Sequence, residues 1–303
     1  MSGTRNADSS AATAHYREMV RRMMYSNGDL EEPLPPCVDM VLDLAKFQMV
    51  KALQDAWEQA NAQGRSCIAL EDVLVLFRRH KFLLKRLLQF AEAAERISLL
   101  KQAAPRPAKL DEDPDQDSDV DDDDLATASV PDSSFSRMQN YVDIMGLGQS
   151  AAELMQLPDG EFEERQRRVA EIVMNGITSE EYPRYTAART ATFLDETKRA
   201  GRRKNDSVDL LRWLGAPKCE PSVAFVIAFI DAEVVAYYVD ARVHRMKTEA
   251  ESLFLNELRH YEEALRRCVG WRRHRDFLFG FYEESDEKVP DNKVENGSEA
   301  SEA

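Results

Sequence analysis

Residues 64–73, GRSCIALEDV, place Arg65 seven positions before Asp72, directly after a long stretch of helical sequence. Gly64 can close a turn at this point, and the next helix is expected to begin near Ala69, with Asp72 in its first turn. A guanidinium beside a carboxylate at a helix N-terminus is favoured both by ion-pair geometry and by the helix dipole. We therefore predict a structural ion pair between Arg65 and Asp72. Arginine and aspartate occur at this spacing by chance in many chains, so the flanking sequence decides what the pair means.

The helices predicted around this joint follow a short, long, short order. Apolar residues recur at three- and four-residue steps from Pro36 to Gln63, which is typical of one amphipathic helix of about 40 Å. A helix of about three turns around Tyr16–Met24 precedes it and ends before a proline-rich stretch. A short helix at Val73–Phe77 follows, and then another from His80 to about Leu100. Together with the Arg–Asp spacing, this order predicts a histone fold, whose long helix needs a partner of like shape.

A second helical block repeats the order without evident sequence identity. Two shorter helices are expected first, at Phe135–Met145 and Phe162–Met174. An aromatic and apolar stretch at 182–214 then precedes a second long helix, from about Pro221 to Thr248, and a final helix at Leu255–Cys268. We predict an all-α chain in which two histone folds pair intramolecularly and are joined by an acidic disordered linker.

This interpretation divides the chain into six parts. They are a disordered arm (1–12), an N-terminal histone fold with an extension helix (13–104), the acidic disordered linker (105–134), a helical connector (135–177), a C-terminal histone fold (178–282) and an acidic disordered tail (283–303).

The acidity of the chain is concentrated outside its helical blocks. The net charge is −15, but Asp111–Asp124 holds ten acidic and no basic residues, and 283–303 holds eight acidic and two basic ones. The rest of the chain is therefore near neutral, and the overall charge says little about partners. Ser118, followed by two aspartates within three residues, is a candidate phosphorylation site. A plain solvating spacer is the simpler interpretation of this segment.

Two basic clusters raise the question of nucleic acid. The first, at 78–86, could contact DNA phosphates, but its interleaved leucines favour an amphipathic helix packed on the domain. Direct DNA contact is therefore possible but not favoured. The second cluster is a candidate nuclear import signal, with a solvated loop as an equal alternative. Its members are Lys198, Arg199, Arg202, Arg203 and Lys204.

The sequence offers no catalytic set, cofactor motif or metal site. The four cysteines, at 37, 67, 219 and 268, form no CxxC pair, and the five histidines are scattered. The most hydrophobic run, Val223–Ile230, is too short to span a membrane. We predict a non-enzymatic intracellular chain without cofactor, metal or membrane partner.

Three stretches resemble a known family. The first two stretches resemble the first and central helices of histone-fold subunits of TFIID and SAGA. The residues concerned are Met23, Met24, Tyr25, Gly28, Asp29 and Pro33 in the first stretch, and Leu42 and Asp43 in the second. The third stretch is similar to the C-terminal half of the SAGA coactivator subunit of the Spt-three family. The residues that carry this similarity are Tyr182, Tyr185, Arg189, Thr192, Phe193, Leu211–Leu214 and Glu233–Val235. The resemblance covers about residues 14–270. One departure is the joint at 246–254, MKTEAESLF, which has no arginine seven residues before an aspartate.

The resemblance implies a nuclear subunit of the SAGA coactivator complex that helps to bind and deliver the TATA-binding protein to promoters for RNA polymerase II. Other SAGA core subunits, including histone-fold subunits, are then expected partners. Glu233 is the position that best matches an acidic residue expected to contact the TATA-binding protein. Exposure to solvent or capping of a neighbouring arginine is the alternative for Glu233. For the whole chain, the alternative is a TFIID-type or DNA-binding histone-fold subunit that pairs with a separate histone-fold chain.

Overall fold

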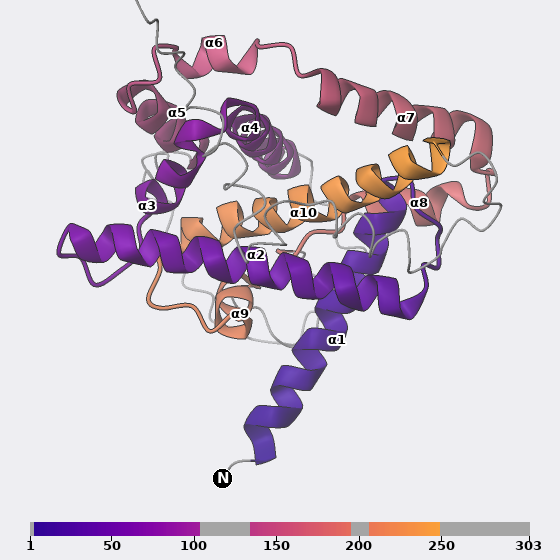
Figure 1. Ribbon diagram of the computed structural model, residues 1–303, viewed down its shortest axis with the longest axis horizontal. Helices are drawn as coiled ribbons and strands as arrows, with labels where there is room; N and C mark the ends of the chain where they lie inside the picture. The colour runs from indigo at the N-terminus through magenta and orange to yellow at the C-terminus, as the bar shows by residue number, and fades with distance from the viewer. Residues whose placement is uncertain (1–2, 104–133, 195–205, 249–303) are drawn as a thin grey trace, which may run out of the picture.

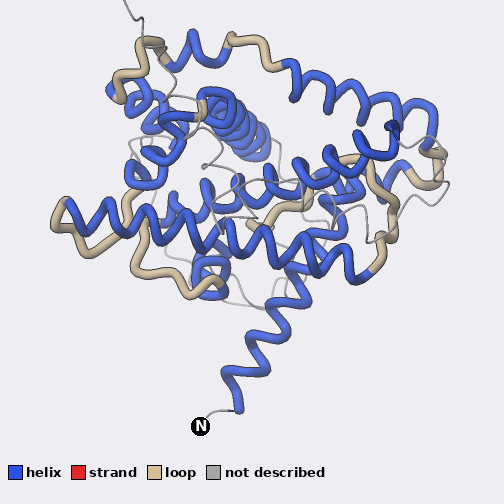
Figure 2. Tube along the Cα trace, viewed as in Figure 1, coloured by secondary structure: helices blue, strands red, loops and turns tan. Residues whose placement is uncertain are grey.

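The computed structural model describes residues 3–103, 134–194 and 206–248, and every regular element in these ranges is a helix (Figure 2). The first range contains α1 (Gly3–Ser26), α2 (Pro35–Ala62), α3 (Leu70–Leu74), the 3-10 helix η1 (Val75–Arg79) and α4 (Lys81–Ala103). The others contain α5 (Ser134–Ile144), α6 (Ala151–Met155), α7 (Gly160–Gly176), α8 (Tyr182–Arg189), α9 (Asp206–Trp213) and α10 (Pro221–Thr248). The expected all-α class is confirmed for the described residues.

The two long helices, α2 and α10, pack side by side through the middle of the molecule (Figure 1). Each is 28 residues long and begins with proline, whose fixed φ suits the first helical turn. The apolar positions predicted for the first long helix, such as Met49 and Leu53, are buried against this partner, as are Ile227 and Val234 of α10. Removal of this apolar surface from water is the main force that holds the two halves together.

Helix α1 crosses beside α2 and α10 and carries α8 and α9 on its flank (Figure 1). Tyr16 packs between Phe193 and Trp213, with ring centroids 4.7 and 4.3 Å away. The expected disordered arm at 1–12 is wrong in its extent, because α1 begins at Gly3. Four alanines within residues 7–14 supply the helix propensity that the apolar periodicity did not reveal.

Helices α3, η1, α4, α5 and α6 form a group at one end of the long helices (Figure 1). Leu84, Leu87 and Leu88 of α4 are fully buried, as the interleaved pattern predicted. Lys85 and Arg86 of the first basic cluster are also buried, at 6% and 7% exposure. These two cations therefore face the protein interior.

Helix α10 is long and apolar enough, from Pro221 to Val243, to pass a composition test for a membrane span. In the folded chain, however, 78% of the most apolar 18-residue segment of this helix is buried. Its place beside α2 explains its apolar character.

Several predicted features lie outside the described residues. They are Ser118, the candidate import signal, the final helix at 255–268, the acidic tail and nearly all of the linker. Ser134, the last residue assigned to the linker, is the first residue of α5.

Candidate functional site

The structure brings Arg65 and Asp72 together at the joint between α2 and α3. The Arg65 Nη1 donates to Asp72 Oδ2 at 2.7 Å, and Nη2 binds Asp72 Oδ1. The same Oδ2 accepts the backbone N–H of Ala69 at 2.8 Å, so the carboxylate also closes the start of α3. Asp72 is only 1% exposed. The pair therefore fixes the direction in which the chain leaves α2.

Replacement of Asp72 by alanine is expected to destabilise the chain by about 1–3 kcal/mol, because it removes the carboxylate that binds both Arg65 and the Ala69 N–H at the start of α3. Equilibrium denaturant unfolding measures the change. Asp39→Ala is the matched control, since Asp39 forms an exposed pair with Arg17 that contributes little. Equal losses for the two variants would show that Asp72 has no special role at the joint.

The segment after α2 runs beside the segment before α10. The Ile68 N–H donates to the Lys218 carbonyl at 2.9 Å, and the Glu220 N–H donates to the Ile68 carbonyl at 2.9 Å. These bonds make a parallel bridge between Ile68 and Cys219. The end of the first long helix is thus tied to the start of the second, and the buried Ile68 side chain packs beneath the bridge.

Arg137 of α5 spans the same joint. Its guanidinium binds Glu71 of α3 at 2.7 Å and Glu220, next to the bridge, at 3.0 Å. A side chain from the connector therefore holds the two halves of the chain in register at this end.

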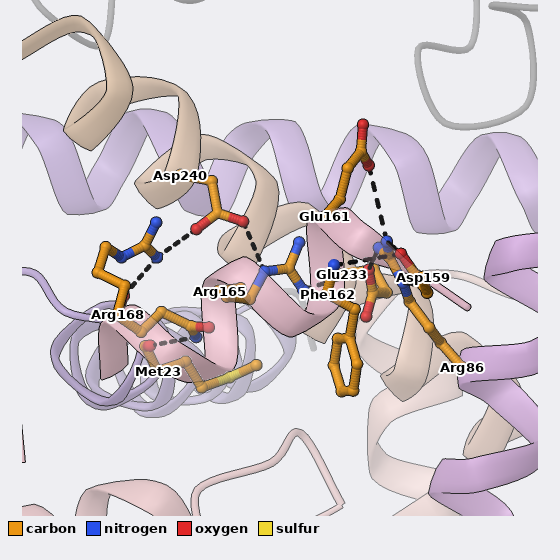
Figure 3. A network of polar contacts seen from close by, with 10 residues as sticks. Met23, Arg86, Asp159, Glu161, Phe162, Arg165, Arg168, Glu233 and Asp240 are labelled. Carbon is orange, nitrogen blue, oxygen red and sulfur yellow. Dashed lines mark hydrogen bonds and ion pairs between the residues drawn. The ribbon is translucent and has the colours of Figure 1, made fainter. Parts of the chain in front are cut away.

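A buried charge network joins α4, α7 and α10 (Figure 3). The Arg86 Nε and Nη2 donate to the two carboxylate oxygens of Asp159 at 2.6 and 2.9 Å, and Nη1 donates to Glu233 Oε2 at 3.0 Å. Asp159 is the N-cap of α7, where its Oδ1 accepts the Phe162 N–H at 3.1 Å. The Arg86 guanidinium, on α4 of the first block, thus binds both a carboxylate of α10 in the second block and the N-cap of the connector helix α7.

The electrostatic balance in this network favours the charged forms. Burial disfavours the charge on Arg86, but the hydrogen bond to Asp159 and the nearby charge of Glu233 outweigh it and raise the pKa of Arg86 above its usual range. Burial likewise favours a neutral Asp159, but the hydrogen bonds from Arg86 and the Phe162 N–H lower its pKa. The network consists of ions that stabilise one another.

Two arginines on α7 extend the network along α10 (Figure 3). Arg165 lies 3.5 Å from Glu233 through Nη1 and 2.5 Å from Asp240 through Nε. Arg168 binds the other oxygen of Asp240 and donates to the Asn27 carbonyl at 3.1 Å. Helix α7 is therefore attached both to α10 and to the end of α1.

Glu233 occupies the centre of this network. The residue is 8% exposed, and its carboxylate is shared between Arg86 and Arg165. Direct binding of the TATA-binding protein through Glu233 would require this side chain to be exposed, but it is buried in the structure. The geometry corresponds to the alternative interpretation, in which the carboxylate binds a neighbouring arginine.

A separate buried pair closes the other end of α10. The Arg242 Nη1 donates to Asp29 Oδ1 at 2.6 Å, with side chains 2% and 0% exposed. Asp29 follows α1, within one of the stretches on which the family resemblance rests. Its role in the fold is thus to bind the second long helix.

The described residues contain no group of three or more His, Cys, Asp or Glu side chains placed to hold a metal ion. Cys37, Cys67 and Cys219, the cysteines among the described residues, form no disulfide bond. Burial raises the pKa of Cys219 to about 11, so its thiol carries little nucleophilic thiolate at neutral pH.

Comparison with known proteins agrees with this architecture. Residues 14–104, which cover most of α1 through α4, match the family of the transcription initiation factor IID 18kD subunit. The SAGA complex subunit Spt3 of Schizosaccharomyces pombe is 24% identical over 240 residues, which are 74% of this chain and 71% of that protein. The chain is thus similar to Spt3 and to a family of histone-fold proteins. A second Spt3-family relative, Protein SPT3 of Kluyveromyces lactis, is 33% identical over 72 residues, 24% of this chain and 22% of that protein.

Several residues of the site were not singled out in the sequence. Asp159, Arg165 and Asp240 lie in ordinary charged helical segments, and Arg86 was assigned to a basic cluster. The partners of Arg86 are 73 to 147 positions away from it, and those of Arg165 are 68 and 75 positions away. Among these contacts, only the local Arg65–Asp72 pair has a spacing from which it can be predicted.

Proposed function

We propose that this chain is a non-enzymatic subunit of a SAGA-type transcription coactivator complex, acting in the nucleus. The observation that carries the proposal is the similarity to the Schizosaccharomyces pombe subunit, which extends over both helical blocks. Other core subunits of the complex, including histone-fold subunits, are the proposed partners. Direct DNA contact is not favoured, because Lys85 and Arg86 of the first basic cluster are buried in protein contacts.

Within this subunit, we propose that the two blocks form a histone-fold pair in one chain. Three features support the pairing: the equal lengths of α2 and α10, their mutual burial, and the backbone bridge between Ile68 and Cys219. The family match confined to residues 14–104 favours the second candidate, a TFIID-type or DNA-binding subunit whose first block binds a separate histone-fold chain.

A nicked chain distinguishes the two arrangements. A protease recognition sequence is inserted between residues 104 and 133, and the purified full-length protein is cut and passed through a gel-filtration column. Intramolecular pairing predicts that the two fragments elute together in a one-to-one complex, because the apolar contact of α2 with α10 remains intact. Separate elution of two soluble fragments would support pairing with another chain.

We further infer that the chain helps to bind and deliver the TATA-binding protein to promoters for RNA polymerase II. The resemblance at Glu233–Val235 supports this role. In the structure, Glu233 is bound by Arg86 and Arg165, so its contribution is indirect while these ion pairs are intact. Retention of purified TATA-binding protein on the immobilised full chain is expected to fall by about tenfold in Glu233→Lys, which corresponds to about 1.4 kcal/mol. Glu58→Lys, an exposed site on α2, is the control.

Circular dichroism and the melting temperature of both variants show whether the fold is retained. Retention by Glu233→Lys equal to that of the control would remove Glu233 from the binding site. Failure of the unaltered chain to retain the TATA-binding protein at all would remove this partner from the proposal.

A further inference from the structure

Helix α7 is attached to the rest of the molecule mainly through charged side chains. Its inward-facing apolar residues, Phe162, Val169, Ile172 and Val173, are only half-buried and lie outside the continuous apolar core. Met174, near its end, is 83% exposed. Salt weakens ion pairs of partly exposed groups, such as those of Asp240 with Arg165 and Arg168, more than it weakens apolar packing.

The surface beneath α7 is a stripe on α10 formed by Glu233, Tyr237 and Asp240. These residues are four and three positions apart, so they lie on one face of the helix. The two carboxylates bind Arg165 and Arg168, which are themselves three positions apart on α7. The acidic stripe is therefore shaped to bind a helix that carries two arginines at this spacing.

Release of α7 from the acidic stripe would leave no buried charge on α10 without a counter-ion. Arg86 remains paired with Glu233, because it comes from α4. The Asp240 side chain is already 26% exposed and can be hydrated. Besides these ion pairs, the hydrogen bond from Arg168 to the Asn27 carbonyl and the contact of Ile172 with Gly28 must open. The N-cap Asp159 can stay bound to Arg86 if α7 swings out about its first turn.

We propose that α7 is a displaceable internal ligand, and that the acidic stripe binds an arginine-bearing helix of a partner protein when α7 moves away. The arginines of α7 then occupy the positions that the partner's arginines take. The inference goes beyond the proposed function, since the stripe and its internal ligand can be tested without any complex subunit. It also explains how Glu233, buried in the closed arrangement, becomes available to a partner.

A peptide that reproduces the internal ligand tests the proposal on the full chain. The probe is a fluorescent peptide of residues 158–177, and its binding is followed by fluorescence anisotropy. In the double variant Arg165→Gln with Arg168→Gln, α7 no longer competes, so the peptide is expected to bind roughly tenfold or more tightly than to the unaltered chain. Arg167→Gln is the matched control, because Arg167 is 61% exposed and its ion pairs among the described residues are with Glu164 and Glu171 of α7 itself.

Two further arms locate the binding site. Addition of Asp240→Asn to the double variant should reverse the gain, and a peptide with glutamine at both arginine positions should not bind. Equal peptide binding by the unaltered chain and the double variant, or binding that ignores Asp240→Asn, would overturn the proposal.

Hydrogen exchange of the unaltered chain provides a measurement that needs no variant. Between about 0.05 and 0.5 M salt, the amides of α7 are expected to lose protection while those of α2 and α10 keep theirs. Loss of α7 protection only together with α10 would show that α7 is an integral part of the core. If the double variant binds the peptide tightly but retains the TATA-binding protein no better, the internal ligand stands and that partner does not.

Discussion

Replacement of Asp231 by asparagine is expected to remove a loss of stability that grows as the pH rises above about 3.8, the ordinary pKa of its carboxyl. Asp231 lies on α10 and is 0% exposed. Both of its carboxylate oxygens are buried without a hydrogen-bond partner among the described residues. Burial therefore raises the pKa of this group well above its ordinary value and favours its protonated form in the folded chain.

The direction of the pH dependence follows from proton binding. In the unfolded chain Asp231 releases its proton above about pH 4, whereas the folded chain retains it, so stability falls as the pH rises towards the folded-state pKa. Between the ordinary pKa of 3.8 and the folded-state pKa, each pH unit lowers the free energy of unfolding by about 1.4 kcal/mol. Asparagine has nearly the same shape and no proton to release, so it removes this cost.

Thermal unfolding between pH 4 and 8 measures the effect. The melting temperatures of the unaltered chain and of Asp231→Asn should diverge as the pH rises. Asp43→Asn, at an exposed position on α2, is the control and should follow the unaltered chain. Parallel curves for Asp231→Asn and the unaltered chain would mean that the carboxyl ionises normally in the folded state.

Replacement of Arg86 by methionine is expected to destabilise the chain by about 3–5 kcal/mol, because it leaves buried carboxylates without their main counter-ion. Asp159 and Glu233 are 3% and 8% exposed, and both are bound by this one guanidinium. Methionine preserves much of the apolar stem, so the loss reports on the charge. Denaturant unfolding of the full chain provides the measurement.

Two comparisons give this prediction its meaning. Arg96→Met, on the same helix but 73% exposed, should change the unfolding free energy by less than about 1 kcal/mol. Neutralising Asp159 and Glu233 to asparagine and glutamine in the Arg86→Met background should recover part of the loss. A loss no larger than that of Arg96→Met would show that water or another cation can take the place of Arg86.

Structural features that depend only on residues close together in the chain can be predicted from the local sequence pattern. The two long helices were expected at Pro36–Gln63 and about Pro221–Thr248, and α2 and α10 span Pro35–Ala62 and Pro221–Thr248. Asp72 is within one loop of Arg65, so their spacing alone brings them together. Helical periodicity and short-range geometry act over a few residues, which is why both could be predicted.

The candidate site itself was not predictable in this way. Glu233 was recognised as notable, but its environment depends on Arg86, 147 positions earlier in the chain, and on Arg165 of the connector. The pair of Asp29 with Arg242 spans 213 positions. No local pattern specifies which charged residues of distant helices will meet.

The helical class, the two long helices, the pair at the joint and the family resemblance are all encoded in neighbouring or regularly spaced residues, so they can be predicted from the amino-acid sequence. The cover of α7 over the acidic stripe of α10, and the sharing of Glu233 between two arginines, are visible only in the folded chain. The physical reason is that an ion pair depends on distance in space, and packing of the two long helices sets those distances for residues far apart in the chain.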